Sequence, residues 1–139
     1  MPHPILLYDG VCKLCNRFVQ FILRNDREAI FQFASLQSAL STQILTRHHA
    51  NPTDLDTVYV VLNPELPDES LLSRSAAVLF VLKQLQGVYH PTATVLQLLP
   101  KFLRDAAYNT IAGRRYQIFG RNDTCPLPND QDRPRFLDL

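Results

Sequence analysis

Short apolar runs alternate with helical apolar stripes along the first part of the chain. The run 5–8 is continuously apolar and stops at an Asp-Gly pair, which predicts a buried strand followed by a turn. Over 12–25 the apolar positions recur at helical spacing, which predicts an amphipathic helix. The segment 30–34 predicts a second strand, and 38–47 a second helix for which Ser35 can serve as the cap.

A second strand pair and a third helix follow. The segment 57–62 is rich in β-branched residues and is the strongest strand candidate, with a short hairpin partner at 70–72. Ser73 or Ser75 can cap a helix up to Gly87 that is apolar nearly all round, as expected of a helix buried on more than one side. The order β-α-β-α-β-β-α is that of the thioredoxin and glutaredoxin core, so the predicted class is α/β.

The pattern changes after this core, which covers about 1–87. The extension, about 88–139, is helical over 92–99 and 100–119, and its proline-rich tail is expected to lie as a loop against the domain. The long helix of the extension should bury an apolar stripe and expose a mostly basic face. The stripe comprises Phe102, Leu103, Ala106, Ala107 and Ile111, and the polar face Lys101, Arg104, Asp105, Arg114, Arg115 and Arg121.

Composition narrows the class of protein. With 139 residues, 46% of them hydrophobic, the chain can build one core, and we expect a single domain over 1–139. A net charge of +1 gives no reason to expect nucleic acid or an anionic membrane as partner. The longest uncharged apolar run, 76–82, is far shorter than the ~20 residues of a membrane span. Three cysteines are too few for a disulfide framework, which favours a reducing, cytoplasmic location.

Two of these cysteines, Cys12 and Cys15, are three positions apart at the start of the first predicted helix. A thiolate in the first helical turn faces unpaired backbone N–H groups and the positive end of the helix dipole, so its pKa should fall. We expect Cys12 to be the more exposed thiol and the attacking nucleophile, and Cys15 to resolve the mixed disulfide. No metal ligand set and no dissociable cofactor is needed for this chemistry.

Asp9 lies three residues before Cys12, at the end of the first strand. Its carboxylate could carry the proton that Cys15 loses or regains, which would make Asp9 catalytic. It could instead cap the helix through its side chain, and both roles are compatible. A carboxylate near the pair would also raise the thiol pKa and oppose the helix dipole.

Two other functions are compatible with the same residues. A metal-binding module could use Cys12, Cys15 and Cys125, although a single CxxC supplies only half of a zinc site. A non-enzymatic interaction domain could dock its helical extension on a partner. Cys125 itself could be a third redox thiol, a metal ligand or a small buried hydrophobic residue.

Four segments of the chain resemble a known family. The segment 9–16, DGVCKLCN, resembles the D-G-x-C-x-x-C-N signature of the DCC family of thiol-disulfide oxidoreductases, also called domain of unknown function 393. The segments 31–38 (FQFASLQS), 73–79 (SRSAAVL) and 115–125 (RYQIFGRNDTC) are similar to further blocks of that family, in the same order. The resemblance implies a thioredoxin-like fold and disulfide exchange with a protein or a glutathione-like thiol.

The resemblance also implies a substrate-binding side. In a glutaredoxin-like arrangement Arg74 and Ser75 would approach the cysteine pair, where Arg74 could stabilise the thiolate or bind a substrate carboxylate. Arg74 could equally be an ordinary surface arginine. The family often has an acidic residue where this chain has Ala76. Thioredoxins carry a cis-proline where this chain has Asp56-Thr57, so Thr57 should face the substrate, and this departure weakens the expectation of general disulfide reductase activity.

Overall fold

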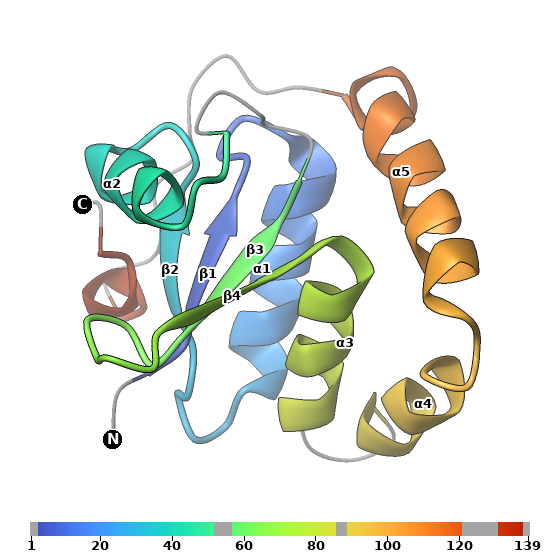
Figure 1. The fold of residues 1–139 in the computed structure, drawn as a ribbon, viewed down its shortest axis with the longest axis horizontal. Helices are drawn as coiled ribbons and strands as arrows, with labels where there is room; N and C mark the ends of the chain where they lie inside the picture. Colours follow the sequence, from blue (N-terminus) through green and yellow to red (C-terminus); the bar gives the residue numbers. More distant parts are fainter. Residues whose placement is uncertain (1–2, 52–56, 86–88, 121–130, 138–139) are drawn as a thin grey trace.

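A computed structural model of the chain describes residues 3–51, 57–85, 89–120 and 131–137, in which four strands form one mixed sheet with helices on both faces (Figure 1). The strands are β1 Ile5–Tyr8, β2 Gln32–Ser35, β3 Tyr59–Leu62 and β4 Ser70–Ser73. The helices are α1 Lys13–Asn25, α2 Ala39–Arg47, α3 Arg74–Gln84, α4 Tyr89–Leu96 and α5 Lys101–Ile118, followed by the short 3₁₀ helix η1 Arg133–Arg135. The predicted order and the helical extension are confirmed.

The sheet places β1 at its centre. The strand order is β2-β1-β3-β4, with β1 parallel to β2 and antiparallel to β3, and with β3 antiparallel to β4. Leu6 of β1 lies opposite Phe33 on one side and Val60 on the other. A central strand covered on both faces explains why 5–8 is apolar at every position. The topology is that of the expected thioredoxin-like fold.

Two hydrophobic cores lie on the two faces of the sheet, because successive side chains of a strand point to opposite faces. Leu6 and Tyr8 join one core, with residues of α1 and α3. Ile5 and Leu7 join the other, with residues of α2. Because β1 and β3 are antiparallel neighbours, the residues that follow β1 and those that precede β3 lie at the same end of the sheet.

The cap of α2 differs from the prediction. Ser38 is the N-cap residue, and its Oγ accepts a hydrogen bond from the backbone N–H of Ser41 at 3.2 Å. The prediction of Ser35 as cap is wrong because β2 extends to Ser35, which pairs with Tyr8. The Oγ of Ser35 instead accepts from the backbone N–H of Gln37 at 3.2 Å in the turn between the two elements.

The buried face of α5 also differs. Phe102 is 72% exposed and Ile111 53% exposed, so the predicted apolar stripe does not face the core. Arg115, predicted on the basic face, is instead only 4% exposed, and Ala112 is buried beside it. Helical periodicity predicts that apolar residues face the core. Here an arginine faces the core instead, because its charge is paired with a buried carboxylate that is described below. No helix in the described ranges, α5 included, is long and apolar enough to cross a membrane.

The end of the described chain, 131–137, packs at the open edge of β2, in agreement with the expected position of the tail. The ring of Phe136 stacks on that of Phe33 with centroids 5.1 Å apart, and the N–H of Leu137 donates to the carbonyl of Phe33 at 2.8 Å. Arg135 forms an ion pair of 2.5 Å with Asp26. These contacts cover an edge strand that would otherwise expose unpaired backbone groups.

Candidate functional site

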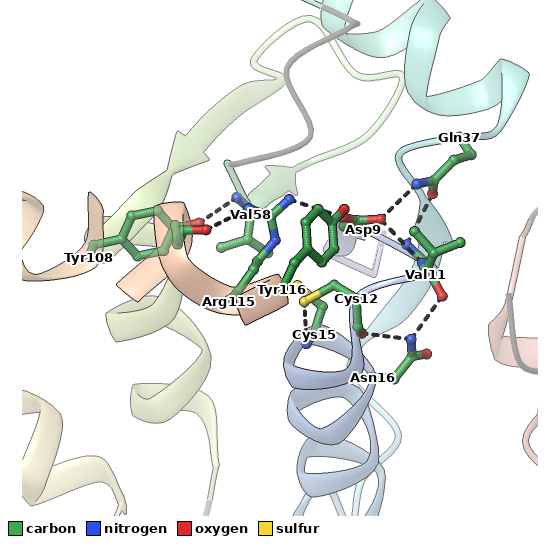
Figure 2. A network of polar contacts seen from close by, with 12 residues as sticks. Asp9, Val11, Cys12, Cys15, Asn16, Gln37, Val58, Tyr108, Arg115 and Tyr116 are labelled. Carbon is green, nitrogen blue, oxygen red and sulfur yellow. Dashed lines mark hydrogen bonds and ion pairs between the residues drawn. The ribbon is translucent and has the colours of Figure 1, made fainter. Parts of the chain in front are cut away.

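Both cysteines lie at the junction of β1 and α1. Cys12 is the N-cap residue of α1, and its Sγ accepts a hydrogen bond from the backbone N–H of Cys15 at 3.3 Å. Both thiols are free in this structure. The side-chain amide of Asn16 donates to the carbonyls of Gly10 at 2.8 Å and Cys12 at 2.9 Å. The thiol of Cys12 is thus held at the helix terminus by a turn that these hydrogen bonds join together (Figure 2).

The two thiols have opposite pKa shifts. A hydrogen bond from the Cys15 thiol lowers the pKa of Cys12 to about 6, against the opposing effect of burial, with further help from backbone N–H groups and the charge of Arg115. The same hydrogen bond raises the pKa of Cys15, and burial and the negative charge of Cys12 add to this effect. Near neutral pH Cys12 is therefore the thiolate and Cys15 the protonated donor, in the direction predicted for Cys12.

The exposure of the pair is the reverse of the expectation. Cys12 is 0% exposed, whereas Cys15 is partly exposed, so the prediction that Cys12 is the more accessible thiol is wrong. The segment that follows α5 contacts the start of α1 next to this pair. The carbonyl of Gly120 accepts a hydrogen bond from the backbone N–H of Lys13 at 3.3 Å. Figure 2 shows the side chains of Arg115 and Tyr116 next to the cysteine pair.

Asp9 is the centre of a buried polar group that joins three parts of the chain (Figure 2). Its side chain is fully buried. One carboxylate oxygen accepts hydrogen bonds from the N–H of Val11 at 3.2 Å and the amide of Gln37 at 2.7 Å. The other accepts from the guanidinium of Arg115 at 3.0 Å and from the hydroxyl of Tyr116. We call Asp9, Gln37, Arg115 and Tyr116 the Asp9 cluster.

The cluster fixes the charge state of its members. Burial is the strongest single influence on Asp9 and would raise the pKa of its carboxyl, but the hydrogen bonds from Tyr116, Gln37, Arg115 and Val11 outweigh it and lower that pKa. Burial and the bond to Asp9 raise the pKa of Tyr116 to about 12. Asp9 is therefore a carboxylate paired with an arginine and a neutral tyrosine.

This geometry decides one of the two predicted roles of Asp9. Asp9 does not cap α1, because the side chain of Cys12 occupies the capping position, so the helix-cap interpretation is wrong. The proton-transfer role stays a prediction, and a lowered carboxyl pKa makes Asp9 a weaker base than a free aspartate.

Three members of the cluster were absent from the sequence-based site. Arg115 lies 106 positions after Asp9, and a hydrophobic pattern cannot associate residues so far apart. The signal that could have identified them was the family resemblance itself, because Gln37, Arg115 and Tyr116 all fall within the segments 31–38 and 115–125 that carry it.

A cavity of about 280 Å³ lies beside Cys15. Its polar margin includes Thr57, Asp9 and Arg115. Most of its wall comes from apolar side chains of α1, α3 and α5, namely Leu14, Phe18, Val78, Ile111 and Ala112. The site therefore combines a thiol pair with an adjoining apolar space.

The three residues predicted to bind substrate have different positions. Thr57 lines the cavity, beside the cysteine pair. Ser75 is buried and donates a 2.5 Å hydrogen bond to Asp105 of α5. Arg74 is exposed at the first position of α3, in the left-handed backbone region with φ of 54°. Neither Arg74 nor Ser75 lines the cavity, and a substrate-binding role for them stays a prediction.

Metal ligands were the other interpretation of the cysteines. Within residues 3–51, 57–85, 89–120 and 131–137, no three His, Cys, Asp or Glu side chains gather closely enough to hold a metal ion. Cys125 lies outside the described residues. The metal-binding and third-thiol interpretations, which both need Cys125, therefore stay predictions.

Comparison with known proteins agrees with the family resemblance. The profile of the DCC1-like thiol-disulfide oxidoreductase family matches residues 6–121. A chloroplastic DCC family protein of Arabidopsis thaliana is 40% identical over 125 residues, which cover 90% of this chain and 70% of that protein. The uncharacterized protein YuxK of Bacillus subtilis is 36% identical over 137 residues, covering 99% and 96% of the two chains. No solved structure matches this chain.

Proposed function

Because the chain belongs to the DCC1-like thiol-disulfide oxidoreductase family, we propose that Cys12 and Cys15 cycle between dithiol and disulfide and exchange electrons with a thiol or disulfide substrate. The observation that supports this most directly is the position of Cys12 at the N-cap of α1, with its Sγ bonded to the N–H of Cys15. A thiolate there, with a pKa of about 6, is ionised near neutral pH and is an effective nucleophile.

The proposed reaction proceeds in two displacements. The Cys12 thiolate attacks one sulfur of a disulfide R–S–S–R, which forms the mixed disulfide Cys12–S–S–R and releases one thiolate R–S⁻. Cys15 then loses its proton and attacks the Cys12 sulfur, which forms the Cys12–Cys15 disulfide and releases the second thiolate. The protein loses two electrons and the substrate gains them. The reverse sequence oxidises a dithiol substrate.

Within this scheme Asp9 acts as a positioning residue. Its carboxylate holds Arg115, and the charge of Arg115 contributes to the lowered pKa of Cys12. The departing thiolate R–S⁻ is itself a sufficiently strong base to accept the proton that Cys15 loses. If Asp9 also accepted the proton that Cys15 loses, this transfer would be a second route for the same proton.

The chemistry needs no dissociable cofactor, because the electrons pass between sulfur atoms. The substrate class is a thiol or disulfide, either on a protein or in a small molecule. A reducing compartment such as the cytoplasm would return the pair to its dithiol form. The Arabidopsis relative is named as chloroplastic, and its compartment is a property of that protein.

Thiol counting on the full chain tests the proposal. After oxidation by bis(2-hydroxyethyl) disulfide, dithiothreitol should restore two thiols per chain, and Cys125→Ser should leave that number unchanged. Cys15→Ser should accumulate a mixed disulfide with hydroxyethyl thiol on Cys12, detected by mass spectrometry, whereas Cys12→Ser should not. A pair that does not oxidise reversibly would refute the proposal.

A further inference from the structure

The cavity beside Cys15 has polar groups that are already engaged with one another. Arg115 is paired with Asp9, and the hydroxyl of Tyr108 accepts a hydrogen bond from the backbone N–H of Val58 at 2.8 Å. Arg115 is the only cation among the described lining residues. A charged ligand entering here would therefore lose hydration and would have to compete with Asp9 for that cation.

The remaining wall favours an uncharged group. Apolar side chains from three helices line this wall, namely Leu14 and Phe18 of α1, Val78 of α3, and Ile111 and Ala112 of α5. A dry apolar cavity of about 150 Å³ accommodates benzene. At about 280 Å³, this cavity has room for a substituted aromatic ring or a short branched alkyl chain.

Of the two cysteines, Cys15 lines the cavity, whereas Cys12 is buried and does not. The Cys15 thiol is hydrogen-bonded to the sulfur of Cys12. A ligand whose apolar group fills the cavity and whose sulfur sits at its margin therefore lies beside Cys15, one hydrogen bond away from the sulfur of Cys12.

We propose that this cavity is the substrate subsite and that it selects low-molecular-weight disulfides and thiols with an uncharged apolar substituent. The inference rests on the function proposed above and identifies its substrate class. Cys12 attacks the ligand sulfur at the cavity margin, one apolar thiolate leaves, and Cys15 completes the two-electron exchange by releasing the second. Glutathione, whose carboxylates and ammonium group are charged, is a poor substrate for this subsite.

Single-turnover kinetics test this selectivity. The reduced full chain, freed of reductant, is mixed with 4,4′-dithiodipyridine, bis(2-hydroxyethyl) disulfide or glutathione disulfide, and loss of the Cys12 thiol is followed in quenched samples by mass spectrometry. Each rate is divided by that of the same disulfide with N-acetylcysteine thiolate, which removes differences in intrinsic reactivity. Burial of one ring should give the aryl disulfide a normalised advantage of about tenfold.

Matched variants on α5 locate the effect. Ala112→Leu fills part of the cavity and should lower the ratio of the normalised aryl rate to the normalised hydroxyethyl rate about tenfold, from its value in the natural chain to about one. Ala107→Leu makes the same change at an exposed position of the helix that does not line the cavity, and should leave both rates unchanged. Ile111→Ser, at a half-exposed wall position, removes apolar wall without overpacking and should also slow the aryl disulfide selectively.

A binding measurement separates this inference from the proposed reaction. In Cys12→Ser/Cys15→Ser, thioanisole should produce saturable NMR shifts at the amides of Val78 and Ile111, and Ala112→Leu should abolish them. If the pair oxidises reversibly but thioanisole does not bind and the aryl disulfide has no advantage, the subsite inference is overturned while the reaction stands. If the pair does not react with any disulfide, both are overturned.

Discussion

Replacing Arg115 with methionine should strongly destabilise the folded chain. The guanidinium lies 3.0 Å from the carboxylate of Asp9, and both side chains are almost fully buried. At an effective dielectric constant of about 20, two charges at this distance attract each other by about 5 kcal/mol. Removing one partner leaves the other charge buried without its counter-ion, which typically costs about 3–5 kcal/mol. We therefore expect Arg115→Met to lower the free energy of unfolding by that amount.

Urea denaturation of the reduced protein measures this loss, with Arg114→Met as the control. Arg114 is the preceding residue of α5 but is exposed, so its replacement should change stability by less than about 0.5 kcal/mol. The double variant Asp9→Asn/Arg115→Met removes both charges and should lose about 2–3 kcal/mol less than the sum of the two single variants. A loss below about 1 kcal/mol for Arg115→Met, or strict additivity in the cycle, would show that the pair is not a buried ionic contact.

The same ion pair predicts the sign of a pH dependence. The pKa of Asp9 in the folded chain lies below the ordinary value of 3.8, so its stabilising contribution is present above that pH and disappears as the pH falls through the folded value. The difference in unfolding free energy between the natural chain and Asp9→Asn should therefore shrink when the pH is lowered from about 6 to about 3. A difference that is constant over this range would contradict the assignment.

Two further predictions concern the thiol pair and the tail. Cys15→Ala removes the thiol that donates to Cys12, so the pKa of Cys12 should rise from about 6 towards the ordinary value of 9.0. Cys15→Ser keeps a donor and should raise that pKa less. The pH profile of iodoacetamide alkylation at Cys12 measures both values, and equal profiles for the two variants would refute the role of the hydrogen bond. Phe136→Ala removes a buried ring that stacks on Phe33 and should lower the free energy of unfolding, measured by urea denaturation, by about 3 kcal/mol. Replacing the exposed neighbour, Leu137→Ala, should lower it by less than about 1 kcal/mol. Equal losses would mean that the tail does not contribute to the core.

Local patterns were sufficient for most of the core fold. The apolar run of β1 and the helical spacing of α1 reflect burial on a central strand and on one helix face, and the pattern that such burial imposes is seen in residues close together in sequence. The position of Cys12 and Cys15 at the start of α1 followed from the same reasoning. These features are local, so their prediction needed no tertiary contact.

The parts that could not be predicted depend on contacts across the whole chain. Periodicity assigned Arg115 to the surface because an arginine is rarely buried without a partner, and that partner, Asp9, belongs to a different element. The contact of Gly120 with Lys13, which brings the segment after α5 to the start of α1, is long-range in the same way. Ser35 was misassigned for a smaller reason: a strand end and a helix cap favour the same residue type, and only pairing with Tyr8 distinguishes them.

The distance in sequence between Asp9 and Arg115 has a consequence for how the protein acquires reactivity during its synthesis. A nascent chain that has emerged only as far as α3 already contains both cysteines but lacks the arginine, which lies 106 positions after Asp9. Until α5 docks, Cys12 lacks that positive charge and Asp9 lacks its counter-ion. The hydrogen bond between the two cysteines, which lowers the pKa of Cys12 most, joins residues that emerge together, whereas the smaller contribution of Arg115 is added only once α5 has been made and has docked.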